Sequence, residues 1–204
     1  MSRVNGPRTI QIAWILGFAL FVSGCATGFN ANPKDPFESM NRSVSSFNDT
    51  VDDNVLKPVA TGYRDHTPEL VRKGVNNFFR NLSDVLSTVN NGLQLKGRDT
   101  AESFMRVTVN TVFGIYGIFD VATPIGLERH PEDFGQTLGY WGVPDGPDLV
   151  LPLFGPSTVR DSSVLPLEFA LDPVSNHDVT GERNVAVMTR IVDKRSSLLK
   201  TTSL

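Results

Sequence analysis

Cys25, the only cysteine in this 204-residue chain, stands in a setting that points to one specific chemistry. It follows a basic stretch over 3–8, an apolar run over 10–22 and the small pair Ser23-Gly24. The apolar run reaches about 20 Å as a helix, which is short of the ~30 Å hydrocarbon core of a bilayer. This order is typical of a lipoprotein signal peptide, in which the thiol is diacylated and the chain is cut before it. We predict residues 1–24 as a signal peptide and Cys25 as the lipidation site; the alternative is a small residue after an ordinary cleavage site.

Acylation of Cys25 would fix where the chain works. Stable anchoring takes more than one acyl chain, and a mature lipoprotein usually carries three. Ala26 stands where an aspartate would keep a lipoprotein of enteric bacteria in the inner membrane, so we expect the outer membrane, facing the periplasm. Residues 25–34 are small, polar and rich in chain breakers, which predicts a lipidated tether in front of one domain over 35–204.

The composition argues against several other kinds of protein. With one cysteine, the chain forms no internal disulfide and no cysteine-cluster metal site. A net charge of -3 and a pI of about 5.6 argue against nucleic-acid binding, which relies on a basic face. A mean hydropathy of -0.11 argues against a protein with many membrane spans. No glycine-rich nucleotide motif occurs, so we expect no cofactor.

The densest group of ionisable residues surrounds His130. With Glu132 and Asp133, it has the side-chain types of a metal or acid–base site. We prefer the interpretation that these carboxylates lie in the first turn of a helix, where they favour the N-terminal dipole. Ser157 lacks the Gly-x-Ser-x-Gly pattern of an activated nucleophile and is more typical of a helix cap. We therefore predict a binding or transport protein without catalytic or metal-binding residues, not an enzyme.

Three arginines are candidates for contact with lipid phosphate groups, because a guanidinium binds phosphate through two parallel hydrogen bonds. They are Arg42, Arg64 and Arg160. Each has acidic residues nearby in the sequence, so the alternative for each is an ordinary ion pair.

The apolar periodicity predicts an all-α domain built of amphipathic helices. From residue 36, apolar side chains recur every three or four residues and define one face of a helix that we expect to stop at Pro58. A second helix is expected to begin at Thr67-Pro68, and Asp84 is expected to cap a third.

The fourth expected helix, over 100–113 after a cap at Asp99, is apolar over more than half its circumference. Such a face is buried on two sides or contacts lipid. Two apolar stretches, 114–126 and 148–156, contain glycines and prolines that predict long irregular loops. They either cover the protein's own core or touch something apolar such as a bilayer. The remaining helices are expected over 131–139, 157–164 and 180–199.

The stretch from Asp35 to Asp161 resembles the MlaA (VacJ) family of outer-membrane lipoproteins, and its motifs occur in the family's order. Among them are Asp35-Pro36-Phe37-Glu38, Asn41-Arg42, Phe47-Asn48, Lys57-Pro58-Val59-Ala60, Tyr63-Arg64, Asn110-Thr111, Phe119-Asp120-Val121-Ala122, Glu132-Asp133-Phe134-Gly135-Gln136-Thr137-Leu138-Gly139, Trp141-Gly142-Val143, Leu149-Val150-Leu151-Pro152-Leu153-Phe154-Gly155-Pro156-Ser157 and Arg160-Asp161.

This resemblance implies a ring-like, membrane-associated single domain. Members of the family look like helical rings in the inner leaflet of the outer membrane, associated with trimeric porins. Their central channel admits glycerophospholipids that have strayed into the outer leaflet. The lipid then passes to a soluble periplasmic carrier, MlaC. Removal of stray lipid by this route maintains the lipid asymmetry of the outer membrane. We therefore expect a glycerophospholipid, the outer-membrane bilayer, a trimeric porin and MlaC as partners, and no nucleic acid.

The resemblance also suggests gate and channel residues. Phe47 and Asn48 match a family position whose disturbance is associated with a misgated channel; the alternative is that Phe47 belongs to the core. Gly135, Gly139 and Gly142 are candidates for close packing at a constriction of the channel.

Two other functions compete with passive lipid transfer. One is a structural lipoprotein that only scaffolds porins, and the other is a phospholipase that uses Ser157 or His130. The sequence also departs from the family at its end, because many members continue beyond the stretch that matches Arg195–Leu199 into a further helix. Any role of that extension is in doubt for this chain.

Overall fold

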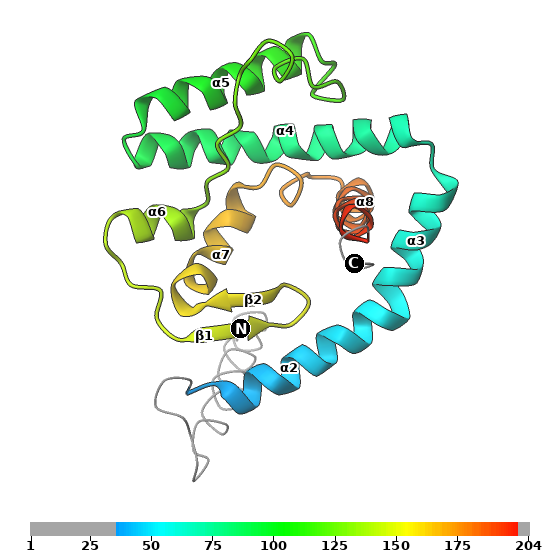
Figure 1. The fold of residues 1–204 in the computed structure, drawn as a ribbon, viewed down its shortest axis with the longest axis vertical. Coiled ribbons are helices and arrows are strands. Elements are labelled where there is room, and N and C mark those ends of the chain that lie inside the picture. Colours follow the sequence, from blue (N-terminus) through cyan, green and yellow to red (C-terminus); the bar gives the residue numbers. More distant parts are fainter. Residues whose placement is uncertain (1–35, 200–204) are drawn as a thin grey trace, which may run out of the picture.

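The computed structural model describes residues 36–199. Cys25 and the predicted boundaries of the signal peptide and the tether lie outside the described residues. The described chain is mostly helical, as predicted, and forms a ring (Figure 1). Its elements are α2 (Glu38–Val51), η1 (Asp52–Leu56), α3 (Lys57–His66), α4 (Glu69–Leu93), α5 (Gly97–Val112), α6 (Phe134–Tyr140), β1 (Asp148–Leu151), β2 (Gly155–Thr158), α7 (Val159–Leu171) and α8 (Thr180–Leu198).

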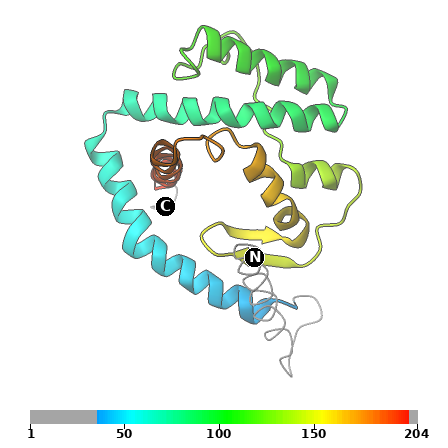
Figure 2. The same cartoon turned by 180° about the vertical axis from the view of Figure 1, so that it is seen from behind.

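The elements follow one another around the ring. The helices α2, η1 and α3 form one arc, and the long α4 makes the next side. α5 turns back along the outer side of α4 (Figure 2). α6, the hairpin of β1 and β2, and α7 make the remaining side, and the hairpin meets α2 and closes the ring. α8 lies inside the ring, against α3 and α4.

The prediction that Pro58 stops the first helix is wrong, because the helical arc runs on to His66. A turn of π-helix, η1, directly precedes α3, and Pro58 is the second residue of α3. The wider π turn shifts the backbone hydrogen-bond register, so the missing N–H of proline falls where no regular α-helical bond is required. Pro58 therefore marks the change from π-helix to α-helix and not the end of the helical arc.

The predicted break at Asp84 is also wrong, because α4 is one helix of 25 residues. Asp84 lies in its middle, is buried, and accepts a hydrogen bond from Nε of Arg129 at 2.6 Å. Asp84 therefore lies within the helix and does not begin one, because Arg129 supplies a partner for its carboxylate.

The later helices agree better with the sequence. α5 begins at Gly97, so Asp99 lies in its first turn and does not cap it. Asp133 caps α6 by accepting the backbone N–H of Gln136 at 2.6 Å. α7 begins after Thr158 and continues through Pro166, beyond the predicted end, at the cost of one backbone hydrogen bond. α8 has almost its predicted bounds.

The second predicted irregular stretch is a short antiparallel hairpin. β1 and β2 pair in a register that sets Leu149 opposite Ser157 and Leu151 opposite Gly155. Leu153 and Gly155 have φ angles of 68° and 85°, which allow the chain to turn back within a few residues. The strands are too short to show the alternation that would have identified them.

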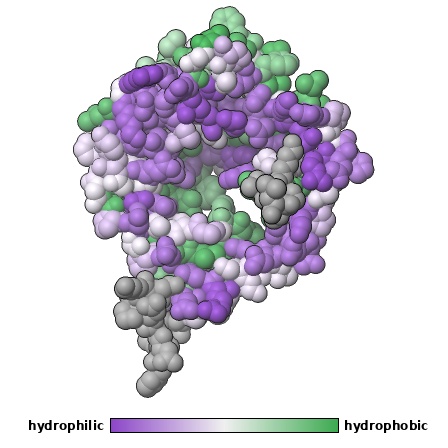
Figure 3. Space-filling view, viewed as in Figure 1, coloured by the Kyte–Doolittle hydropathy of each residue, from purple (hydrophilic) through white to green (hydrophobic). Residues whose placement is uncertain are grey.

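Burial in this chain is the reverse of the usual pattern. Within residues 36–199, most of the buried side chains are polar, among them Asn81, Asn90 and Arg106. The apolar face of α5 is largely exposed and not buried on two sides; Phe113, which follows the helix, is 71% exposed. Figure 3 shows hydrophobic residues gathered over this end of the molecule and within the central hollow. Within residues 36–199, no helix combines the length and the apolar character needed to cross a membrane.

Candidate functional site

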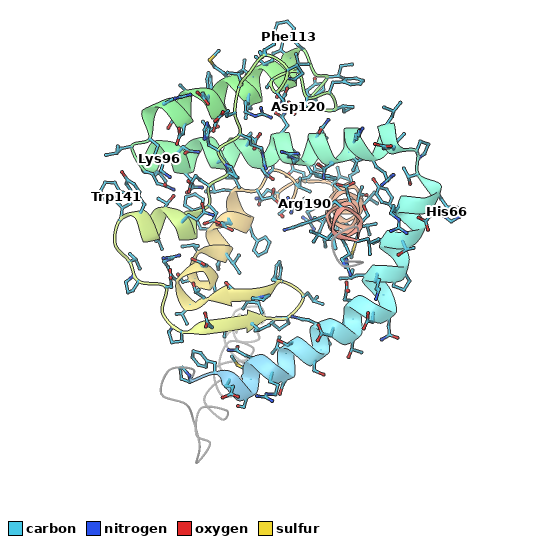
Figure 4. The ribbon with its side chains drawn as sticks, in the orientation of Figure 1. His66, Lys96, Phe113, Asp120, Trp141 and Arg190 are labelled. Atoms are coloured by element: carbon cyan, nitrogen blue, oxygen red, sulfur yellow. The ribbon has the colours of Figure 1, made fainter. Side chains whose placement is uncertain are left out.

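A polar cavity of about 510 Å³ lies between α4, α6, α7 and α8. Figure 4 shows Arg190 pointing from α8 toward the interior of the ring, whereas Phe113 and Trp141 lie on the outside. The residues that line the cavity are Ser83, Leu86, Ser87, Asn90, Arg129, Pro131, Glu132, Asp133, Phe134, Gln136, Glu168, Phe169, Asp172, Arg190 and Lys194.

Two of the cations in this cavity are held by acids. Arg190 binds both carboxylate oxygens of Asp172, at 3.0 and 2.9 Å. Burial opposes ionisation of Asp172, but Arg190 and the Ser175 hydroxyl outweigh it and lower the pKa of Asp172 below its ordinary value. Arg129 is paired with Asp84. These two arginines are therefore fixed in place.

Lys194 and Glu168 are the charged groups that this cavity leaves most available. Lys194 is exposed and forms no ion pair within residues 36–199. Glu168 accepts the backbone N–H of Phe134 at 3.1 Å. Burial raises the pKa of Glu168, and the nearby charges of Asp133 and Asp161 raise it further. A cation and an acid thus face one cavity, as a zwitterionic ligand group would require.

An apolar groove of about 860 Å³ lies along the first half of α4. The connection after α5 and the side of α8 form its other walls. The lining residues are Leu70, Val71, Lys73, Gly74, Val75, Asn77, Phe78, Phe79, Ile118, Phe119, Asp120, Ala186 and Thr189. Its lining is mostly apolar, whereas that of the polar cavity mixes charged and polar side chains with apolar ones.

The same two helices wall both hollows. α4 contributes Leu70 to Phe79 to the apolar groove and Ser83 to Asn90 to the polar cavity. α8 contributes Ala186 and Thr189 to the groove, and Arg190 and Lys194 to the cavity. Apolar and polar surfaces therefore follow one another along a shared pair of helices.

The predicted gate residue Asn48 lies where α2 meets the hairpin. Its side-chain amide donates to the backbone oxygen of Leu151 at 3.0 Å and accepts the N–H of Leu153 at 2.8 Å. The neighbouring Phe47 is 51% exposed, so it is not a core residue. The gate role of the pair stays a prediction, but the structure places Asn48 at the closure of the ring.

Asn41, two helical turns before Asn48, makes the same kind of contact. Its amide donates to the backbone oxygen of Asp148 at 3.0 Å and accepts the N–H of Val150 at 2.8 Å. The side-chain amides of the two asparagines bond the backbone of β1 and of the turn after it, as a neighbouring strand would. We call Asn41 and Asn48 the asparagine clasp. Sequence reasoning missed Asn41 as a functional candidate, although its spacing from Asn48 sets both on one helix face.

The predicted constriction glycines lie in and just after α6. A side chain at Gly135 would collide with the carboxylate of Asp161, and one at Gly139 would meet Nη1 of Arg160 at 2.6 Å. These two glycines therefore allow α6 to pack closely against the start of α7. Gly142 has open space around it but a φ of 90°, so its role is to end the helix.

The three candidate headgroup arginines lie in three different places. Arg160 binds Asp145, Asp161 and the backbone oxygen of Val143, so it ties α7 to the chain beyond α6. Arg42 pairs with Glu38 at 2.7 Å on the exposed side of α2. Arg64 pairs with Asp65 at 2.8 Å on α3. None of the three lines the polar cavity.

The predicted candidates for catalysis or metal binding make separate contacts. Glu132 binds Lys96 at 2.7 Å, and Asp133 caps α6, so neither faces His130. The Ser157 hydroxyl accepts a hydrogen bond from Ser162. The ring nitrogen Nε2 of His130 lies 2.8 Å from Glu102 on α5.

A second clasp, missed from the sequence, holds α8 inside the ring. Arg195 donates to both carboxylate oxygens of Asp52, in the π turn, at 2.7 and 2.8 Å. The Tyr63 hydroxyl and the Asn76 amide donate to the buried Asp193 at 3.2 and 2.9 Å. Burial and the charge of Asp193 raise the pKa of Tyr63 to about 12. α8 is thus fixed to α3 and α4 by polar contacts.

Comparison with known proteins gives a consistent picture. The family model described as MlaA lipoprotein matches residues 33–204. The intermembrane phospholipid transport system lipoprotein MlaA of Escherichia coli K12 is 36% identical over 154 residues, which cover 73% of this chain and 61% of that protein. An uncharacterized protein of Rickettsia typhi is 42% identical over 142 residues, which cover 69% of this chain and 56% of that protein. The chain therefore spans little more than half the length of these relatives.

The fold is similar to that of a solved structure described as the structural basis for maintenance of bacterial outer membrane lipid asymmetry. The TM-score is 0.71 at 33% sequence identity, and the superposition covers 82% of this chain and 85% of the other.

Proposed function

Because this chain belongs to the MlaA lipoprotein family, we propose that it removes glycerophospholipids from the outer leaflet of the outer membrane and passes them toward the periplasm. The family relatives named above are described as components of intermembrane phospholipid transport. Transfer of an intact lipid breaks no covalent bond, so the proposed reaction needs neither a nucleophile nor a cofactor.

The observation that carries this proposal is the pair of hollows on α4 and α8. A phospholipid has a charged headgroup and two apolar tails, and burying either in the wrong surroundings costs free energy. The polar cavity offers Lys194 for a phosphate group and Glu168 for an ammonium group. The adjoining apolar groove suits the tails. Arg42 and Arg64 remain candidates for headgroup contact at the surface, outside the cavity.

The exposed apolar side chains support a site of action in the bilayer interface. Met105 in the middle of α5, and Phe113 and Ile125 after it, are exposed and would be unfavourable in water but not among acyl chains. Tyr140 and Trp141 add aromatic rings of the kind enriched where bilayer meets water. We include lipidation at Cys25 and a position at the outer membrane, facing the periplasm, in the proposal.

The proposal also includes partners. A two-chain phospholipid is too apolar to cross the aqueous periplasm alone, so a soluble carrier such as MlaC has to accept it. A trimeric porin is the partner that the family resemblance implies for the outer side of the ring. Phe47 and Asn48 would gate the ring where the asparagine clasp closes it.

The proposal is tested by filling the polar cavity. In a strain lacking the gene, outer-leaflet phosphatidylethanolamine on intact cells is measured with a membrane-impermeant amine reagent. The deletion is expected to raise the labelled fraction, and the wild-type gene to restore it. Gln136→Trp adds a large side chain to the cavity wall without removing a buried group, and this variant is expected to fail.

Thr108→Trp, on the exposed side of α5, is the matched control and is expected to restore asymmetry fully. A deletion without effect on labelling would refute lipid transfer. Full activity of Gln136→Trp would favour the porin scaffold instead. Mass spectrometry of the purified protein is expected to find intact phospholipid, whereas lysophospholipid and free fatty acid would indicate a phospholipase. Cys25→Ala is expected to leave the protein without acyl label and outside the membrane fraction.

A further inference from the structure

We propose that Glu102, Glu128 and His130 form a binding site for a divalent transition-metal ion, best suited to Zn²⁺. The three residues come from α5 and from the connection that leads to α6. Their ligand atoms, one imidazole nitrogen and two carboxylate oxygens, all lie within 4.8 Å of one another. The site is separate from both hollows of the proposed lipid path, since none of the three residues lines either.

His130 and Glu102 are hydrogen-bonded to each other, so their ligand atoms stand somewhat closer than they would around a metal ion. Nε2 of His130 lies 2.8 Å from Oε2 of Glu102. Ligand atoms around a tetrahedral zinc ion are about 3.4 Å apart, given bond lengths near 2.0 Å. Glu128 is exposed, so rotation of its side chain is enough to complete the set. Three protein ligands with a water molecule in the fourth position is a common coordination for zinc.

The backbone that carries two of the ligands is already fixed. Arg129, between them, donates from Nε to Asp84 of α4 at 2.6 Å. The backbone oxygen of His130 accepts a hydrogen bond from the amide of Asn91, also on α4, at 2.9 Å. These contacts hold Glu128 and His130 over the first turns of α5. An ion would therefore bind without the ordering of a loose segment.

Charge balance favours a cation here. Asp99, Glu102 and Glu128 bring three carboxylates around His130, with Nδ1 of the ring 3.8 Å from Asp99. Arg98 is paired with this group through Oε1 of Glu102, at 2.9 Å. Three carboxylates thus share one guanidinium and one imidazole, and a divalent ion would add positive charge to this acidic group.

The ligand types select the class of ion. An imidazole nitrogen suits zinc and its neighbours in the transition series, whereas calcium and magnesium prefer a full shell of oxygen ligands. The other ring nitrogen of His130, Nδ1, lies 3.8 Å from the carboxylate of Asp99. In zinc sites the nitrogen that does not bind the metal commonly faces a group that orients the ring. Arg98 leaves Oε2 of Glu102 free to face the ring.

A bound ion would cross-link α5 to the segment between the two hollows. That segment follows Ile118 and Phe119 of the apolar groove and precedes Glu132 of the polar cavity. Because the ion binds the folded chain, it would raise the thermal midpoint, and the increase would grow with the logarithm of its concentration once that exceeds the dissociation constant.

The test uses full-length protein purified in detergent with an affinity tag that contains no histidine. The protein is dialysed against ZnCl₂ and the metal per chain is counted by mass spectrometry. Binding of CoCl₂ is followed by its visible absorption, which reports coordination geometry. Wild-type protein is expected to bind one ion per chain. Glu128→Gln and His130→Gln are expected to weaken binding by about tenfold or more.

The chain offers a matched control in His177, whose Nε2 lies 2.7 Å from Glu182 on α8. This pair has the same histidine–glutamate contact but belongs to no group of three ligands within residues 36–199. His177→Gln is therefore expected to leave zinc binding unchanged. Glu128→Gln changes an exposed residue, so its thermal midpoint without metal is expected to equal that of the wild type.

Three results would overturn the proposal. The first is wild-type zinc binding by Glu128→Gln or His130→Gln. The second is loss of binding in His177→Gln. The third is displacement of zinc by a modest excess of Mg²⁺, which would contradict the assignment to a nitrogen-containing site. All are measured on the purified protein and do not depend on lipid transfer.

Discussion

The two faces of α5 carry opposite kinds of side chain. The face against α4 buries Ser103, Arg106 and Asn110, whereas the outer face exposes Phe104 and Met105. We call the buried polar contact between α4, α5 and the connection after α5 the polar seam. In a water-soluble protein the apolar face would be the buried one. The reversal shows that polar contacts hold α5 against α4, which leaves the apolar face of α5 exposed.

The polar seam also explains how an irregular apolar segment stays ordered. The side-chain oxygen of Asn110 accepts the backbone N–H groups of Val121 and Ala122 at 2.8 and 2.9 Å. Arg106 donates to the backbone oxygen of Leu127 and to Asp120. Buried backbone groups need such partners wherever no helix or sheet supplies them. Because polar side chains supply them here, the apolar side chains of the same segment are free to point outward.

The most severe way to break the polar seam is Asp84→Asn. This change removes the anion between Arg129, at 2.6 Å, and Arg106, at 3.8 Å. Arg129 would then lose its charge partner, and the buried Arg106 would keep, among the described residues, only Asp120, at 3.3 Å. We expect the free energy of unfolding to fall by about 3–5 kcal/mol, measured by denaturant unfolding in detergent.

Asp53→Asn is the control for that experiment, because Asp53 forms an exposed pair with Lys57 at 3.1 Å. Exposed ion pairs contribute little, so no measurable change is expected. Equal losses in the two variants would contradict the distinction between seam and surface.

The asparagine clasp is expected to show a smaller, local effect. Asn41→Ala and Asn48→Ala each remove two hydrogen bonds to the hairpin and are expected to cost about 1–3 kcal/mol. Hydrogen exchange should separate them, because Asn41→Ala frees the N–H of Val150 and Asn48→Ala frees that of Leu153. Asn54→Ala, whose amide bonds within its own helix, is expected to change neither. Unchanged exchange at both amides would show that the clasp does not hold the hairpin.

The ion pair between Arg195 and Asp52, which helps to hold α8, predicts how stability depends on pH. The hydrogen bond from Arg195 lowers the pKa of Asp52 below its ordinary value, so the folded state favours the ionised carboxylate. Its contribution of about 1 kcal/mol is complete above pH ~4 and is lost as the pH falls through the lowered pKa. Arg195→Met is expected to remove that contribution near neutral pH, and to differ less from the wild type in acid. A difference that stays constant from pH 7 to pH 3 would exclude this linkage.

The smallest effect is expected on the apolar surface. Ile115 has a φ of 53°, which is strained for a branched side chain, and it is 57% exposed. Ile115→Gly removes the strain with little loss of packing. The free energy of unfolding should therefore rise by less than about 1 kcal/mol, and the thermal midpoint should rise slightly. The same variant is expected to bind lipid vesicles more weakly. A clear loss of stability would place Ile115 in the core and weaken the contrast between the two faces.

Much of this protein was determined by local sequence. The periodicity of apolar residues predicted the helical class and nearly all of α8, because one turn of helix repeats on the scale that a short window can see. The short helix predicted over 131–139 exists, but Asp133 caps it and Glu132 lies before it, so neither carboxylate is in the first turn as predicted. The family motifs predicted a ring, and the structure has one. The signal peptide and the lipidation of Cys25 remain predictions from the sequence.

The tertiary structure decided what depends on distant partners. Pro58 and Asp84 carry the local signs of helix ends, yet a π turn and Arg129 allow the helices to continue. Asn41 meets the hairpin 107 residues later, and no local pattern reveals such a contact. The apolar face of α5 was legible in the sequence, but whether it faces a core or a lipid was not. Periodicity records which residues share a face, whereas only the folded chain determines what that face meets.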